Sequence, residues 1–200
     1  MSAEDPAPVA ALKEWAAVEA LLASGDVSLL IRKGGLIERR GEFEVEHRRF
    51  WLFPTQYHQN PPELRPDFHW ALEAARDSRP REGRLPLRLL LDVEAAFRIE
   101  DEALLPEIAP LQPYTDEVLH SRFHYRGRPY LHALLVRAFV REEPYPIRRR
   151  PSSRGCVSWV PLEEEVPEEG LRPVLDEEEF ATVRRELLGR VGETTGATPA

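Results

Sequence analysis

One stretch, residues 29–59 with the sequence LLIRKGGLIERRGEFEVEHRRFWLFPTQYHQ, most constrains how this chain can fold. It opens on an apolar run, breaks at Gly34 and Gly35, and ends with a second apolar run, Phe50 to Phe53, directly before Pro54. Apolar runs bounded by Gly and Pro are typical of buried strands. No other part of the sequence sets so much bulky apolar area beside so many polar groups, so we take this stretch as the centre of the fold.

The rest of the chain predicts an α+β fold. Strands are expected over residues 27–32, 43–53, 85–99 and 130–140, and helices over residues 68–77 and 175–191. Residues 10–22 have strong helix propensity, although a strand–turn–strand hairpin over residues 15–32 competes with it. Residues 102–108 suit a short helix or an irregular turn, and residues 115–123 either open a helix or lead into a strand. We expect a single domain over residues 11–191, with a mixed, mainly antiparallel sheet, flanking helices, and flexible tails at residues 1–10 and 192–200.

Composition excludes several classes of protein. Hydrophobic residues make up 42% of the chain and charged residues 31%, which suits a globular protein. No apolar run approaches the roughly 18 residues of a membrane span, and the acidic N-terminus does not resemble a secretory signal. Cys156 is the single cysteine, so an intrachain disulfide is impossible. These features predict a cytoplasmic protein.

Charge is distributed unevenly along the chain, although the net charge is −8. Residues 120–154 contain nine arginines and two acids, and residues 163–179 contain nine acids and one arginine. The basic segment suggests a weak nucleic-acid contact, with tyrosines available to stack on bases, and the acidic segment suggests a protein partner. Alternatively, the two segments neutralise each other across the fold. The candidate nucleic-acid-binding residues are Arg126, Arg128, Arg148, Arg149 and Arg150.

Polar side chains that interrupt or follow the apolar strands predict a ligand cleft. Loops held by rigid strands often carry function, and residues 55–59 form such a loop after Pro54. A histidine in that loop is also compatible with a purely solvated position. The candidate ligand-binding residues are Arg32, Lys33, Arg48, Thr55, His58, Gln59, Arg122 and Arg137.

The sequence predicts no metal site and no cofactor. Glu42, Glu44 and Glu46 would share one face of a strand and could hold a hard cation, but a solvated face between arginines is the better interpretation. His120 and His124 have the i, i+4 spacing of a helical metal site, yet the sequence offers no third ligand beside them. Cys156 has no neighbouring base that would make it a nucleophile.

Several segments carry a family resemblance. They are ALKEW (11–15), LLIRKGGL (29–36), FEVEHRRFWLFPT (43–55) with HQ (58–59), SRF (121–123), LHALLVRAF (131–139) and GCVSWVPL (155–162). Together they resemble the bacterial family called domain of unknown function 1802, over about residues 11–165. No activity is established for that family. Some members are joined to restriction-endonuclease domains of the Mrr type, which implies a link to restriction-modification, but this chain shows no convincing D-(x)n-E-x-K nuclease arrangement.

The order of elements is also similar to that of Nudix hydrolases. Those enzymes use a helix whose glutamates hold Mg²⁺ against a diphosphate. After residues 51–54 this chain instead continues TQYHQNPPELRPDFHWALEAARD, so the hydrolase machinery is missing. The similarity concerns fold order alone.

Three functions therefore follow from the sequence. The first is an accessory or binding module that acts near nucleic acid, in restriction-modification or a related process. The second is an enzyme acting on a small phosphorylated compound, and the third is a protein–protein adaptor. Nothing in the sequence specifies an oligomeric state or a catalytic residue.

Overall fold

The structure, a computed structural model, describes residues 10–33, 45–57, 59–76, 78–80, 82–148, 157–191 and 197–198. These residues form a single α+β domain around one mixed, mainly antiparallel sheet, which confirms the predicted fold class. Within the described ranges, no helix combines the length and the apolar character that crossing a bilayer requires.

The sheet contains eight strands in the described part of the chain. They are β1 (Ala10–Trp15), β2 (Leu29–Arg32), β3 (Arg49–Thr55), β4 (Arg84–Ile99), β5 (Leu131–Arg148), β6 (Trp159–Pro161), β7 (Leu171–Pro173) and β8 (Ala197–Thr198). The main path has the order β2-β5-β4-β3-β1-β6, while β7 pairs with β5 and β8 with β4. The β1–β3 pair is parallel, and the other pairs are antiparallel.

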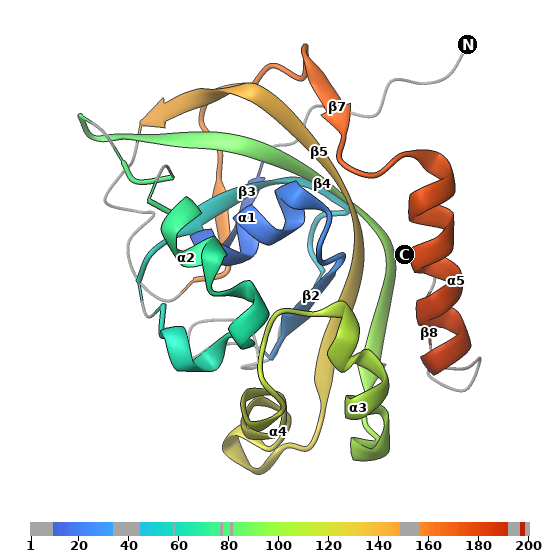
Figure 1. Ribbon diagram of the computed structural model, residues 1–200. Coiled ribbons are helices and arrows are strands. Elements are labelled where there is room, and N and C mark those ends of the chain that lie inside the picture. The colour runs from blue at the N-terminus through green and yellow to red at the C-terminus, as the bar shows by residue number, and fades with distance from the viewer. Residues whose placement is uncertain are drawn as a thin grey trace.

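Five α-helices accompany these strands in the described ranges. They are α1 (Ala16–Ser24), α2 (Trp70–Ala74), α3 (Leu105–Ile108), α4 (Asp116–Phe123) and α5 (Glu177–Val191). Short 3-10 turns lie between them, including Pro66–Phe68 before α2 and Tyr125–Gly127 after α4. Figure 1 shows the long strands β4 and β5 arching over α1, with α5 to one side of the arch.

The long hairpin of β4 and β5 is the frame of the molecule. It pairs from Arg84 with Arg148 at one end to Ile99 with Leu131 at the other, with register shifts after Leu87 and after Val93. The predicted strand over residues 85–99 is confirmed. The predicted strand over residues 130–140 is also confirmed, but it continues to Arg148 through two prolines.

The N-terminal prediction is partly wrong, because residues 10–15 form a strand and not a helix. β1 pairs with β3 on one side and β6 on the other, and this pairing outweighs the helix propensity of its alanines. The chain changes to helix at Trp15, the N-cap residue, and α1 ends at Gly25 with φ of +85°. The competing hairpin over residues 15–32 is therefore also wrong.

Both faces of the sheet carry a hydrophobic core, and β3 shows why. Phe50 and Leu52 belong to the larger core, which includes α1, whereas Trp51 and Phe53 belong to a second core on the opposite face. The unbroken apolar run of β3 is thus explained by burial on both sides.

Other boundaries differ from the predictions in length. Strand β3 begins at Arg49 and not at residue 43, because residues 45–48 lie outside any strand. The predicted helix over residues 68–77 is shortened to α2. The C-terminal helix is confirmed, and Asp176 and Glu179 form a reciprocal capping box at its start, since each side chain accepts from the other's backbone N–H.

Candidate functional site

Arg32 links the two edges of the sheet path through side-chain bonds. It stands at the end of β2, one edge of the sheet path, yet its guanidinium donates to the carbonyl of Lys13 (3.1 Å) and to the carboxylate of Glu14 (3.0 Å), both in β1. A further Arg32 nitrogen donates to Ser158 Oγ at 2.7 Å, directly before β6. The two ends of the sheet are therefore joined by one side chain.

The carboxylate of Glu14 is the internal anion at this junction. Its side chain is only 5% exposed. Besides the Arg32 bond, it accepts from the Trp15 backbone N–H at 2.8 Å and from the Tyr114 hydroxyl at 3.3 Å. Three donors therefore compensate for removing the charge from water.

Arg122, near the end of α4, packs against the same group. Its guanidinium lies 3.8 Å from the centre of the Tyr114 ring and 5.8 Å from that of Trp15. Burial raises the pKa of Tyr114 to about 12, so the phenol stays protonated. Burial acts to lower the pKa of Arg122, but Tyr114 and Glu14 outweigh it and raise that pKa above its ordinary value. The structure thus brings two predicted site residues, Arg32 and Arg122, around one carboxylate.

Lys33 holds the turn that follows α4. Its Nζ donates to the backbone carbonyls of Phe123 (3.0 Å), Arg128 and Tyr130 (2.6 Å). The same Nζ lies 3.6 Å from the centre of the Tyr130 ring. These bonds fix the backbone on both sides of residues 124–128, so Lys33 positions this turn.

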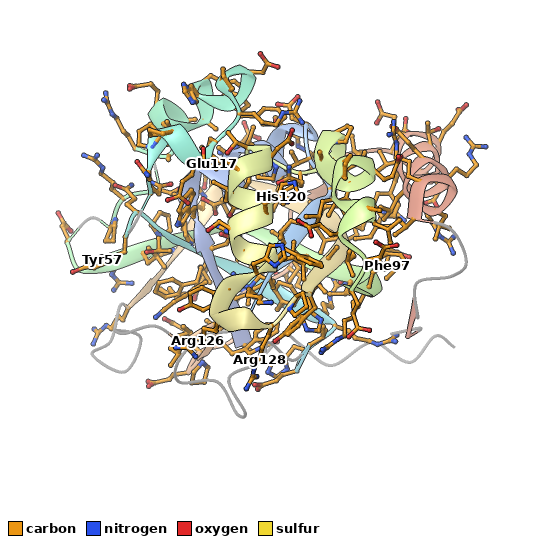
Figure 2. The ribbon with its side chains drawn as sticks, turned by 90° about the horizontal axis from the view of Figure 1, so that it is seen from below. Tyr57, Phe97, Glu117, His120, Arg126 and Arg128 are labelled. Atoms are coloured by element: carbon orange, nitrogen blue, oxygen red, sulfur yellow. The ribbon has the colours of Figure 1, made fainter. Side chains whose placement is uncertain are left out.

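The turn itself presents aromatic and cationic groups to solvent. Tyr125 is 46% exposed, and the guanidinium of Arg126 lies 5.2 Å from the centre of its ring. Arg126 has φ of +61°, a strained value for a residue other than glycine, and Gly127 follows with φ of +66°. Figure 2 shows Arg126 and Arg128 at the same edge of the molecule. We call this region, Lys33 with residues 124–128, the β2–α4 corner.

Two residues of the predicted loop also support the fold. Gln59 Oε1 accepts from the Ala17 backbone N–H at 2.8 Å, in the first turn of α1. Thr55 Oγ1 accepts from the Tyr57 N–H at 3.1 Å. His58 lies outside the described residues.

The other predicted residues lie away from the corner. Arg137, in β5, forms an ion pair with Glu177 of α5 at 2.7 Å. Arg48 is exposed next to the start of β3. Arg148 ends β5 at the opposite end of that strand from the 122–128 turn, and Arg149 and Arg150 lie outside the described residues. The arginines of residues 120–154 that the structure describes therefore do not form one patch.

His120 and His124 do have a third polar neighbour that the sequence did not reveal. Both rings bond Glu102 Oε1, at 2.8 and 3.0 Å, and these bonds lower the pKa of Glu102. Even so, no group of three His, Cys, Asp or Glu side chains in the described ranges is arranged to hold a metal ion.

The sequence is matched by a family model over residues 11–186, described as Domain of unknown function (DUF1802). The chain belongs to the DUF1802 family. This confirms the resemblance carried by its segments, and it brings no activity with it. No curated protein matches the sequence.

Solved structures of an ASCH protein from Zymomonas mobilis are similar in shape to this DUF1802 protein. The unmutated protein has a TM-score of 0.44 and 14% sequence identity, covering 94% of this chain and 95% of the other. A point mutant has a TM-score of 0.43 and 13% identity, covering 78% and 89%. No conclusion about function rests on likenesses of this size.

Proposed function

We propose that this DUF1802 protein is a cytoplasmic binding module for single-stranded nucleic acid and that the β2–α4 corner is its contact surface. The observation that carries the proposal is the exposed ring of Tyr125 beside Arg126, on a turn held in place by Lys33. Proteins bind single strands by stacking bases on aromatic rings and placing cations along the phosphates. The corner supplies both groups from a fixed backbone.

The charges of the corner favour it as the binding surface over the buried group around Glu14, which contains Arg32 and Arg122. Arg32 is already bonded to Glu14, and Arg122 is stacked on Tyr114, so both are used within the fold. Arg126, in contrast, forms no ion pair with any described residue and is exposed. A link to restriction-modification would be one setting for such binding, and we include it in the proposal as an expectation from the family.

Fluorescence anisotropy with labelled single- and double-stranded oligonucleotides at low salt tests the proposal. We expect dissociation constants of roughly 10⁻⁴ to 10⁻⁶ M, the usual range of nonspecific binding. Tyr125→Ala should weaken single-strand binding roughly fivefold or more, because stacking contributes about 1–3 kcal/mol per base. Arg126→Ala should flatten the plot of log K against log salt by about 0.7, the value for one phosphate contact on a single strand.

Two matched variants control for general effects. Tyr57→Ala removes a tyrosine that is 73% exposed and that Figure 2 shows on a different side of the molecule. Arg184→Ala removes an exposed arginine from α5. Neither variant should change the affinity. If Tyr125→Ala and Tyr57→Ala bind equally well, or if wild type shows no binding at tens of micromolar, the proposal is wrong and the small phosphorylated ligand becomes the leading alternative.

A further inference from the structure

The outer face of the sheet is covered by a segment without helix or strand, residues 162–170, which we call the strap. Beneath it lies the second hydrophobic core, which contains Trp51 and Phe53 of β3 and three leucines of β4. None of the buried residues of this core comes from a helix. The strap therefore does the covering that a helix does on the other face.

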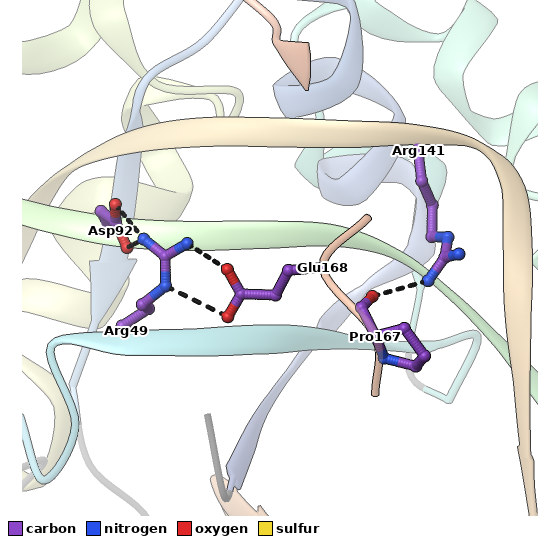
Figure 3. A network of polar contacts seen from close by, with 5 residues as sticks. All are labelled: Arg49, Asp92, Arg141, Pro167 and Glu168. Atoms are coloured by element: carbon purple, nitrogen blue, oxygen red, sulfur yellow. Dashed lines mark hydrogen bonds and ion pairs between the residues drawn. The ribbon is translucent and has the colours of Figure 1, made fainter. Parts of the chain in front are cut away.

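Three consecutive residues anchor the strap. Val166 is 1% exposed and belongs to the second core. Glu168 bonds Arg49 of β3 at 2.6 and 3.5 Å, while Arg49 also bonds Asp92 at 2.6 Å. Figure 3 shows these bonds together with the one from Arg141 to the Pro167 carbonyl, 2.9 Å long. An apolar side chain and a carboxylate two residues later thus face the sheet together, with the carbonyl between them also bound.

The covered face holds donors that the strap does not satisfy. Trp51 Nε1 and Arg141 Nε are buried and meet no acceptor among the described residues. Buried donors without acceptors are uncommon in proteins and destabilise the structure that contains them. An occupant with one more carbonyl or carboxylate in reach would fit this face better than the strap does.

We propose that this face is a docking groove for an extended acidic segment of a partner protein, and that the strap occupies it in cis. The fitting segment carries an apolar residue followed two positions later by a carboxylate, the pattern of Val166 and Glu168. Charge complementarity selects it, because Arg49 and Arg141 point to the groove from β3 and β5. The strap is itself such a segment, LEEEVPEEG, and its other acids are exposed.

Competition between the strap and the partner segment sets the affinity of the partner for the groove. A tethered segment acts at an effective concentration in the millimolar range, so a partner in trans binds weakly while the strap is in place. Weakening the strap should raise the affinity for a free segment without any change in the groove. This behaviour distinguishes a displaceable cover from a permanent part of the core.

The test uses a fluorescent peptide with the sequence LEEEVPEEG and the full-length chain. Anisotropy titrations compare wild type with a variant that combines Val166→Ala and Glu168→Gln, which removes both side-chain anchors. We expect the variant to bind the peptide at least about tenfold more tightly than wild type, since each anchor supports the cis form. Adding Arg49→Ala to that variant should reverse most of the gain, while adding Arg184→Ala should leave it unchanged.

Hydrogen exchange on wild type provides a second measurement that does not depend on the variants folding. Amides of residues 163–169 should exchange well before those of residues 133–140 in β5, because the strap leaves without global unfolding. Equal protection of the two segments, or equal peptide affinity in wild type and the folded variant, overturns the proposal. Dimers of wild type formed by exchanged straps would assign the groove to a second copy of the chain and overturn the assignment to a separate partner.

Discussion

Glu19 is a buried carboxyl group whose protonation should control stability near neutral pH. It lies in α1, is 2% exposed, and accepts a hydrogen bond from Ser78 Oγ at 2.5 Å. Its other oxygen meets no donor among the described residues. Burial raises the pKa of Glu19 from 4.5 to about 7, although the Ser78 bond and the charge of Arg88 act in the opposite direction.

The sign of the effect follows from the raised pKa. Between pH 4.5 and about 7 the folded state holds a proton that the unfolded state has released, so stability falls as the pH rises through this window. At 1.36 kcal/mol per pKa unit, the loss amounts to about 3 kcal/mol by pH 8. Glu19→Gln keeps the shape and removes the charge, so we expect it to match wild type near pH 4.5 and to exceed it by about 3 kcal/mol at pH 8.

Urea unfolding at half-unit steps from pH 4.5 to 8.5 measures this difference directly. Other titrating groups are common to both proteins and cancel in the comparison. Glu142→Gln, at an exposed position of β5, is the matched control and should show a flat difference. A Glu19→Gln effect of the same size at pH 5 and at pH 8 would refute the reasoning, because it would not depend on ionisation.

Two further predictions concern packing and closure. Arg32→Ala should lower the free energy of unfolding by about 3 kcal/mol, because it leaves the buried Glu14 carboxylate without its cation. Chemical denaturation measures this loss, and a much smaller loss would contradict the role given to the Arg32–Glu14 bond. Gly25→Ala should destabilise the fold more than Gly83→Ala. Both glycines have positive φ, but only at Gly25 would the new methyl group lie 2.8 Å from Leu175. Equal shifts in Tm for the two variants would contradict this prediction.

The central strands were predictable from sequence because their burial pattern is local. In β4 and in residues 131–140 of β5 the apolar residues are dense enough to recognise a strand without any distant contact, whereas the polar extension of β5 to Arg148 has no such signal. The boundary at Trp15 was not predictable, because β1 is a strand only through pairing with residues 51–55 and 159–161. The N-cap residue Trp15 makes no side-chain capping bond to mark the change, and the side chain that bonds the first turn of α1 is that of Gln59, 42 residues along the chain.

The candidate site was predictable only where its residues stand out in the local sequence. Arg32 and Lys33 could be singled out as polar residues at the end of an apolar strand. Their partners could not, since Tyr114 lies 100 residues from Glu14 and Ser158 lies 126 residues from Arg32. The sequence signal for this cluster is Glu14 itself, the one carboxylate of the AALKEW segment.

The bridge made by Arg32 also bears on the order in which the chain assembles during translation. Glu14 and Arg32 leave the ribosome close together and can pair early, but among the described strands β2 pairs with β5, which is synthesised about a hundred residues later. Ser158, the third anchor of the bridge, emerges later still. The N-terminal segment must therefore wait for more than half of the chain, and a nascent-chain stalling experiment should find it protected from protease only after residue 158 is out of the exit tunnel.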